Sequence, residues 1–287
     1  MLFSSTVLMN VPISKGLRIG LLGAGRVATQ LAPALVANGH ELVFIWNRSV
    51  ALAEALSERL SPSPAVLTHL AADLPAADVY LLAVPDAAVA SVLAAGRWPA
   101  GAVVAHLAGA LPVQVFEAAP LVRGGVFYPL QTFSPGRVVT WANVPLFIEA
   151  PEAAAEALLL TLARSLSSHV QPLNSAQRLQ LHVGAVFANN FTNHLLGVAH
   201  SLLTEAGLPF ELLAPLIRET VDKALTQPPF AGQTGPAVRR DAPTLAAHQL
   251  ALSEHPRWQQ LYEVLTASIQ AELTSSVRPD QPAAPFQ

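Results

Sequence analysis

Short apolar runs bounded by turn residues recur along the first half of the chain. Each run is continuous rather than alternating, which is typical of parallel strands that helices cover on both faces of a sheet. The runs occupy residues 17–22, 41–46, 79–84, 102–106 and 125–128. Alanine-rich segments at 49–59 and 86–95 fit the covering helices. The pattern therefore predicts an α/β fold with a doubly wound, Rossmann-type sheet.

The second half of the chain changes its apolar period. A strand at 144–149, a helix at 151–166 with proline in its first turn and a short strand at 169–173 extend the sheet to about Pro172. Helical periodicity follows at 175–205, 210–225, 242–253 and 256–275. We predict a flexible leader (1–16), a dinucleotide-binding domain (17–172), an all-helical substrate or dimerisation domain (173–276) and a disordered tail (277–287).

A glycine-rich turn over 23–28 links the first predicted strand to the first predicted helix. Its third small residue is Ala28 rather than glycine, which the dinucleotide fingerprint tolerates because helix and strand only need to pack closely there. Glycines at this place let backbone N–H groups approach a pyrophosphate at the helix N-terminus. Because strand, turn, helix and second strand arrive in order, we expect a bound dinucleotide rather than an empty turn.

The end of the second strand indicates which dinucleotide binds. An acidic residue there would hold the ribose 2′-hydroxyl of NAD, but this chain has Asn47, Arg48 and Ser49. Arg48 offers a planar, permanently charged guanidinium that suits a 2′-phosphate, so NADP is favoured over NAD and FAD; a solvated surface arginine is the alternative. The loop after the strand at 79–84 reaches the same edge of the sheet, although Asp86 there could simply cap the next helix. The predicted cofactor-binding residues are Gly23, Ala24, Gly25, Arg26, Val27, Asn47, Arg48, Ser49, Val84, Pro85 and Asp86.

Polar residues that could carry chemistry follow two other strands and one helix face. His106 ends its strand and could face nicotinamide or substrate, or be a hydrogen-bonded structural residue. His182, Asn189 and Asn193 recur at spacings of seven and four, which puts them on one helical face, with Asn190 one position round. The predicted catalytic residues are His182, Asn190 and His106.

The surroundings of these helix residues are apolar. An unsatisfied buried polar group costs about 1–3 kcal/mol, so the imidazole and amides either bond to other helices or line a pocket. We favour the pocket for His182, because a hydride-transfer enzyme needs a proton donor near neutral pH; the asparagines fit either role. A polar segment at 232–241 with paired arginines could close over an anionic substrate, or be an ordinary helix connection capped by Asp241.

Composition narrows the function classes. The 287 residues are 52% hydrophobic and only 12% charged, so much apolar surface must be buried, in part between subunits. With no cysteine, disulfides, thiolate nucleophiles and cysteine-ligated metals are excluded, and no metal site is predicted. A net charge of −3 without a basic run argues against nucleic acid. Polar interruptions such as those at 85–86 and 189–190 leave no membrane span, so we expect a cytoplasmic protein.

The motifs together resemble a bacterial family in which a Rossmann-like NADP-binding domain precedes a helical domain of unknown function. That family is similar to pyrroline-5-carboxylate reductases, β-hydroxyacid dehydrogenases and deazaflavin-dependent NADP reductases. The resemblance extends from Leu17 to about Ile269. It rests on residues 23–28, 84–86, His106, 129–133, His182, Ala188, Asn190, 234–236, Arg239, Asp241, Thr244 and His248.

The resemblance implies roles for particular residues. In related families a helix residue of the second domain, often lysine, donates a proton beside the nicotinamide, and an asparagine further along assists. His182 and Asn190 correspond to this pair, with Arg178 where a lysine is common and Tyr128 where relatives usually have histidine. The helical domains of such relatives commonly intertwine, which implies a homodimer.

The sequence thus predicts an NADP-dependent oxidoreductase. It would transfer hydride between nicotinamide and a small carbonyl, an imine or a second redox carrier. The alternative is a sensor or scaffold that holds NADP without turnover. A short-chain dehydrogenase is disfavoured because the chain has no Tyr-x-x-x-Lys motif.

Overall fold

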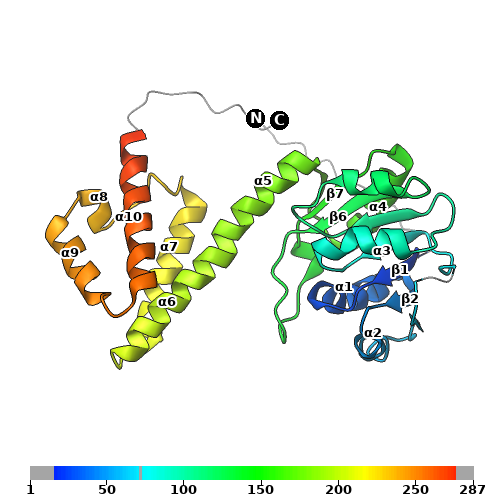
Figure 1. Cartoon of the computed structure of the whole chain (residues 1–287), viewed down its shortest axis with the longest axis horizontal. Coiled ribbons are helices and arrows are strands. Elements are labelled where there is room, and N and C mark those ends of the chain that lie inside the picture. Colours follow the sequence, from blue (N-terminus) through cyan, green and yellow to red (C-terminus); the bar gives the residue numbers. More distant parts are fainter. Residues whose placement is uncertain (1–15, 71–72, 276–287) are drawn as a thin grey trace, which may run out of the picture. The chain divides into compact units, whose positions relative to one another are not determined.

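The computed structural model describes residues 16–70 and 73–275. The predicted tail and all of the predicted leader except Gly16 lie outside the described residues. Two compact units make up the chain, one up to Asn190 and one from Phe191 (Figure 1). The first is built on a sheet and the second on helices alone, and each is described by itself.

The sheet unit contains eight strands in the order β3-β2-β1-β4-β5-β6-β7-β8. All neighbours pair in parallel except β6 and β7, which are antiparallel. The order reverses between β1 and β4, and ligands bind beside the carboxyl ends of strands at such a switch point. The strand bounds are β1 (Arg18–Leu22), β2 (Glu41–Trp46), β3 (Ala65–Leu67), β4 (Val79–Leu82), β5 (Val103–His106), β6 (Arg123–Pro129), β7 (Leu146–Glu149) and β8 (Val170–Pro172).

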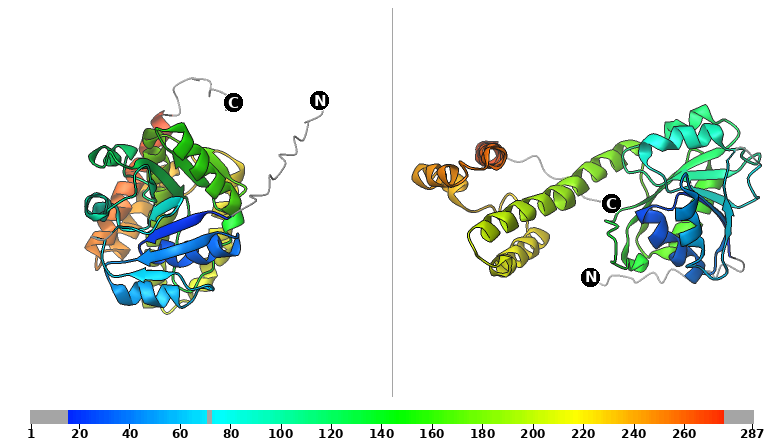
Figure 2. Two further views of the ribbon diagram at one scale, coloured as in Figure 1. Left: turned by 90° about the vertical axis from the view of Figure 1, so that its right-hand side faces the viewer. Right: turned by 60° about the horizontal axis from the view of Figure 1, so that its bottom comes forward.

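Helices cover both faces of this sheet, which explains why its strands are continuously apolar. One core cluster joins the strands to α1 (Arg26–Ala37), α2 (Val50–Ser57) and α4 (Ala153–Leu166). The other joins the opposite face to α3 (Val89–Ala95) and a 3₁₀ segment at Val113–Ala118. The predicted doubly wound, Rossmann-type α/β fold is confirmed. Figure 2 shows the sheet unit in its left view.

Two features of the sheet were not predicted. β3 has only three residues, none of them buried, so it gives no clear apolar run. The antiparallel direction of β7 depends on how the chain returns after Pro129, and hydrophobicity does not encode that direction. β7 and β8 nevertheless lie inside their predicted ranges, with α4 between them.

A helical stretch from Ser175 to Glu205 follows the sheet, as predicted, but it is not regular throughout. It comprises α5 (Ser175–Ala185), a π-helical segment (Val186–Phe191) and α6 (Thr192–Glu205). Asn174 begins it with a reciprocal capping box, in which its side chain accepts from the backbone N–H of Gln177. The sheet ends at Pro172, whereas the compact unit continues to Asn190 because α5 is tied to the sheet by side-chain contacts described below.

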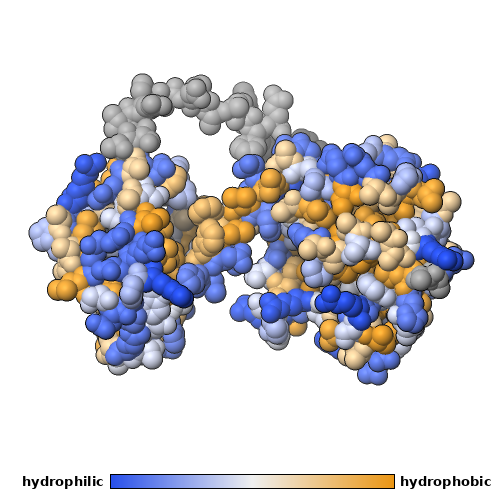
Figure 3. Space-filling model, in the orientation of Figure 1, coloured by the Kyte–Doolittle hydropathy of each residue, from blue (hydrophilic) through white to orange (hydrophobic). Residues whose placement is uncertain are grey.

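The helical unit also contains α7 (Ala214–Thr226), α8 (Pro236–Arg239), α9 (Ala242–Ala251) and α10 (Pro256–Ser275). Only two hydrophobic side chains of its described residues are buried, Ala237 and Leu252. Large apolar side chains remain exposed instead, and Figure 3 shows apolar residues on its surface. They include Leu212, Leu216, Leu225, Phe230, Leu250 and Val264. Among the described residues, no helix is long and apolar enough to cross a membrane.

Candidate functional site at the carboxyl edge of the sheet

The turn after β1 has a backbone that only glycine fits. Gly23 has a φ of 120°, and a Cβ placed on it would lie 2.2 Å from the carbonyl oxygen of Ala83. Residue 83 follows β4, so the turns after the two strands at the switch point touch through Gly23. Any larger residue would separate these turns.

The N-terminus of α1 is open to an anion. Gly25 is its N-cap and provides no side-chain hydrogen bond, and the first turn of the helix contains no acidic residue. A Cβ on Gly25 would meet no atom within 4 Å, and both Gly25 and Arg26 are exposed. The first N–H groups of the helix therefore lack a side-chain cap and face open space, which is the arrangement that binds phosphate.

The three residues after β2 divide into one that holds the turn and two that face solvent. The Asn47 amide accepts a hydrogen bond from Ala24 N at 3.2 Å and donates one to Ser49 O at 3.0 Å. Arg48 and Ser49 are exposed, and Arg48 forms no ion pair with the described part of the chain. A free guanidinium thus lies at the strand end where the fingerprint reads the ribose.

The loop after β4 reaches the same edge. Val84 is half-buried, while Pro85 and Asp86 are exposed. Asp86 opens a 3₁₀ turn whose N-cap is Pro85, and no side-chain hydrogen bond caps that turn. The capping role considered for Asp86 is therefore absent, and its carboxylate is close enough to raise the pKa of Tyr128.

His106 lies inside the unit rather than on its edge. The side chain is fully buried and its ring stacks on Phe116 with centroids 5.8 Å apart. Nδ1 accepts a hydrogen bond from Ala108 N at 3.2 Å, while Nε2 has no hydrogen-bond partner among the described residues. Burial, helped by the charge of Arg178, lowers the pKa of His106 to about 4. At neutral pH this imidazole is uncharged and has no exposed edge.

The contact that sequence reasoning missed joins Tyr128 to His182. Tyr128 lies near the end of β6, and its hydroxyl is 3.0 Å from Nδ1 of His182 on α5. The His182 ring packs so tightly on Gly109 that a Cβ there would lie 2.4 Å from Nδ1. The pKa of Tyr128 is raised, mainly because the phenol is buried. The Arg178 guanidinium acts to lower this pKa, and the Asp86 carboxylate acts to raise it. A polar pair is thus fixed beside the loops after β4 and β5.

Arg178 anchors α5 to the sheet. It is 1% exposed and forms an ion pair with Glu149 at the end of β7. Its Nη2 also donates to Leu111 O at 2.6 Å, and Nε has no partner among the described residues. Glu149 in turn accepts a hydrogen bond from Ser175 N at 3.0 Å, at the start of the helix. This network sets the position from which His182, one turn further on, reaches Tyr128.

The π-helical segment changes which asparagine lies on the same side of the helix as His182. In a regular α-helix Asn190, eight residues on, would lie about 80° round from His182. A π turn holds one extra residue, which removes about 100° of rotation and brings Asn190 to within about 20° of it. The predicted stripe through His182, Asn189 and Asn193 assumed a regular α-helix, which the π-helical segment interrupts. Asn189, Asn190 and Asn193 are exposed and form no hydrogen bonds with side chains that the structure describes.

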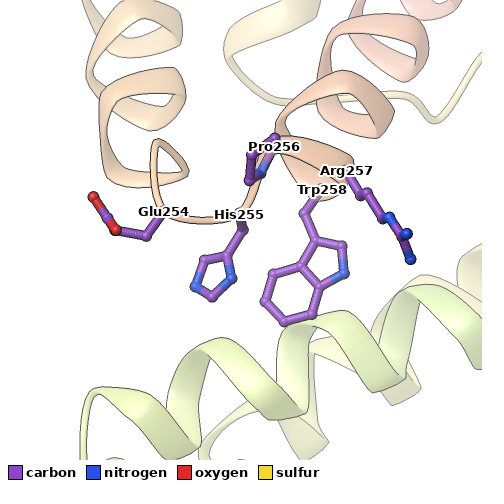
Figure 4. Close-up of a pocket in the computed structure, with 5 residues that line it drawn as sticks. All are labelled: Glu254, His255, Pro256, Arg257 and Trp258. Atoms are coloured by element: carbon purple, nitrogen blue, oxygen red, sulfur yellow. The ribbon is translucent and has the colours of Figure 1, made fainter.

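Two polar clusters lie in the helical unit, one that caps a helix and one that joins two helices. Asp241 caps α9, and its carboxylate accepts from the hydroxyl of Thr244 at 2.8 Å, so this part of 232–241 is a helix connection as the alternative stated. At the start of α10, His255 stacks on Trp258 and pairs with Glu205 of α6 at 2.8 Å. Figure 4 shows both rings pointing toward a neighbouring helix in a shallow pocket. No group of three or more metal-ligating side chains occurs within the described ranges.

Comparisons with known proteins cover both units. A model of Rossmann-like domains matches residues 10–133, and a model of the domain of unknown function DUF2520 matches residues 144–269. No curated protein matches the chain.

Solved structures match nearly the whole chain. A "putative NADP oxidoreductase" from Bacteroides fragilis is 38% identical, with a TM-score of 0.82 over 89% of this chain and 98% of its own. A protein from Thermotoga maritima is 19% identical, with a TM-score of 0.65 over 91% and 100%. A reductive aminase from Aspergillus terreus, in complex with NADPH and ethyl levulinate, is 18% identical, with a TM-score of 0.67 over 91% and 95%. The chain therefore belongs to the family in which a Rossmann-like domain is followed by a DUF2520 domain.

Proposed function

We propose that the protein is an NADP-dependent oxidoreductase acting on a small carbonyl compound, an imine or a second redox carrier. The observation that carries the proposal is the switch point, where Gly23 closes against Ala83 beside the open N-terminus of α1. The name of the Bacteroides fragilis relative and the NADPH held by the Aspergillus terreus enzyme support the same cofactor.

The residues around the switch point fit NADP group by group. The first N–H groups of α1, from Gly25 to Val27, would hold the pyrophosphate. The free guanidinium of Arg48, with Ser49, would hold the 2′-phosphate, while Asn47 keeps the turn in shape. Residues 84–86 would lead the cofactor along the edge toward Tyr128 and His182. When bound, the reduced cofactor supplies a hydride.

Within this proposal His182 serves the acid/base chemistry and Asn190 orients the substrate. His182 is partly exposed and keeps Nε2 free of hydrogen bonds to described residues, whereas His106 is buried and uncharged. We therefore assign His106 a structural part in the loop after β5. Asn190→Ala should lower kcat while Asn189→Ala changes it little, because the π segment brings only Asn190 near the direction of His182. Equal effects of the two changes would remove Asn190 from the site.

We also propose that the helical unit pairs with a second copy of the chain. Leu216, Leu225 and Phe230 are 63%, 81% and 72% exposed in the single chain. Burying one such side chain contributes about 1.5–3 kcal/mol, so a surface with several of them favours self-association.

The rival function is a sensor or scaffold that binds NADP without turnover. The two functions are distinguished by incubating the protein with NADPH and either cyclohexanone plus allylamine or a small aldehyde, and following nicotinamide absorbance together with product. An oxidoreductase consumes NADPH in step with product formation. Tight NADPH binding with consumption no faster than in buffer, for every probe, would instead favour the sensor.

A further inference from the structure

We propose that Tyr128 is the residue that hands the proton to the substrate, and that His182 stands behind it as the proton relay. This inference rests on the proposed oxidoreductase function and adds a catalytic residue to it. Tyr128 would then replace His182 as the group that touches the substrate.

The register of the sheet brings Tyr128 to the edge. The last residue of β5, His106, pairs with Val126, so Tyr128 lies two residues beyond the end of its neighbouring strand. Side chains alternate along a strand, so Tyr128 lies on the same sheet face as Val126. Both belong to the core cluster on the α3 side. Tyr128 therefore extends that face to the carboxyl edge, where residues 84–86 also lie.

The partner of the phenol is held in one place from two sides. His182 is pressed against Gly109, and α5 is locked by the buried Arg178–Glu149 ion pair one turn earlier. The 3.0 Å separation between Tyr128 Oη and His182 Nδ1 is a hydrogen bond in which either atom can donate, depending on protonation. Such a hydrogen bond provides a path along which a proton can pass between the two residues.

The charges around the pair suit a donor that must stay protonated until it reacts. Burial keeps the pKa of Tyr128 above its ordinary value, so the phenol is intact at neutral pH. Arg178, buried and permanently charged, acts in the opposite sense and would stabilise the phenolate once the proton leaves. Asp86 adds a negative charge, and His106 is neutral. His182, whose Nδ1 lies 3.0 Å from the phenol oxygen, is thus the group of this cluster that is placed to replace the proton.

The transfer conserves atoms and charge. As hydride reaches the substrate carbon, the Tyr128 O–H bond breaks and the proton goes to the substrate oxygen or nitrogen. The Nδ1–H bond of protonated His182 then breaks and restores the phenol, leaving His182 neutral. Being partly exposed, His182 regains its proton from water. The substrate gains one hydride and one proton, and Tyr128 ends as it began.

The test compares Tyr128→Phe with a matched control, Tyr262→Phe. Tyr262 forms a second tyrosine–histidine hydrogen bond, with its hydroxyl 2.8 Å from Nδ1 of His248 in the helical unit. Nitrogen-15 NMR of the histidine side chains, recorded with and without NADP, reports the tautomer and titration of each ring and needs no substrate. In wild type, neutral His182 should be the Nε2–H tautomer, because Nδ1 accepts from Tyr128. Tyr128→Phe should change the signals of His182, and Tyr262→Phe only those of His248.

Kinetics with NADPH, cyclohexanone and allylamine supply the second readout. Tyr128→Phe should lower kcat about 100-fold while NADPH affinity stays within about twofold, since one positioned proton donor contributes about 10²–10⁴-fold. Tyr262→Phe should leave kcat unchanged.

The outcomes separate this inference from the proposed function. Unchanged His182 signals in Tyr128→Phe, or a kcat equal to that of wild type, overturn the role of Tyr128 even if NADPH binds. Failure of wild type to bind NADPH overturns the proposed function, and the NMR comparison still decides whether the pair exists. Wild-type spectra give the tautomer without any variant, so poor folding of Tyr128→Phe leaves the test intact.

Discussion

The hydroxyl of Tyr128 lies 3.0 Å from Nδ1 of His182, although the two residues are 54 positions apart in the chain. Tyr128 comes from strand β6 and His182 from helix α5. Gly109, in the loop after β5, packs against the imidazole of His182. Three segments thus converge on one polar pair at the edge where the cofactor is proposed to bind.

Adding one methyl group at Gly109 should displace His182. In Gly109→Ala the new Cβ would overlap the imidazole, which must shift and so disturb the hydrogen bond between its Nδ1 and Tyr128. We expect kcat to fall about tenfold or more with NADPH affinity unchanged, because proton transfer depends on the hydrogen-bond distance. Gly184→Ala is the control, since a Cβ on this α5 glycine meets no atom within 4 Å. Equal kcat values for the two variants would contradict a role for the packed imidazole.

Stability should fall as the pH drops from about 6.5 to about 4. Folding lowers the pKa of His106 from 6.5 to about 4. Between these pH values the histidine is protonated in the unfolded chain but stays neutral in the folded protein. The contribution of neutral His106 is fully present above pH 6.5 and lost progressively below it, by up to about 3 kcal/mol. Urea unfolding of wild type and His106→Asn across this range measures it. The variant should show a smaller fall, and parallel curves would show that His106 is not the titrating group.

The buried Arg178–Glu149 pair should matter far more for stability than a surface pair of the same chemistry. Arg178→Met leaves the Glu149 carboxylate without its cation, at a cost of about 3–5 kcal/mol in the free energy of unfolding. Arg123→Met breaks the exposed Arg123–Glu152 pair and should cost less than about 1 kcal/mol. Denaturant unfolding compares the two variants. A similar loss in both would mean that Arg178 does not anchor α5.

Self-association through the helical unit should be sensitive to charge at Leu216. Leu216→Glu places a carboxylate on a surface proposed to be buried between copies, and burying an unpaired charge is costly. Sedimentation velocity should show a dimer for wild type and a shift toward monomer for the variant. Leu121→Glu, at a similarly exposed leucine of the sheet unit, should leave the dimer intact. A wild-type monomer, or equal behaviour of the two variants, would contradict the proposed interface.

The sheet could be predicted from sequence because its strands carry their own signal. β2 occupies the predicted residues 41–46 because the five residues after Glu41 are all apolar and Asn47 follows them. The glycine turn could also be predicted, because the positive φ at Gly23 strongly favours glycine at that position. By contrast β3, three residues long and without a buried side chain, has no such pattern.

The proposed catalytic side of the site was harder to predict, because its geometry depends on tertiary contacts and on one helical irregularity. The π segment over 186–191 adds a residue to a turn without altering the apolar spacing, so the face of Asn190 was misjudged. The sequence singled out Tyr128 only because related families usually have histidine at this position. Its contact with His182 requires the sheet register and the anchoring of α5 by Arg178.

The most direct test of the account is a titration of the purified protein with NADPH and with NADH. Arg48 at the end of β2 should favour NADPH about 10- to 100-fold, since a charge-assisted hydrogen bond contributes about 1.5–3 kcal/mol. Arg48→Ala should erase most of that preference, whereas Arg59→Ala, another exposed arginine of the same region, should keep it. Equal affinities for the two cofactors, or no binding of either, would contradict the NADP site at the switch point.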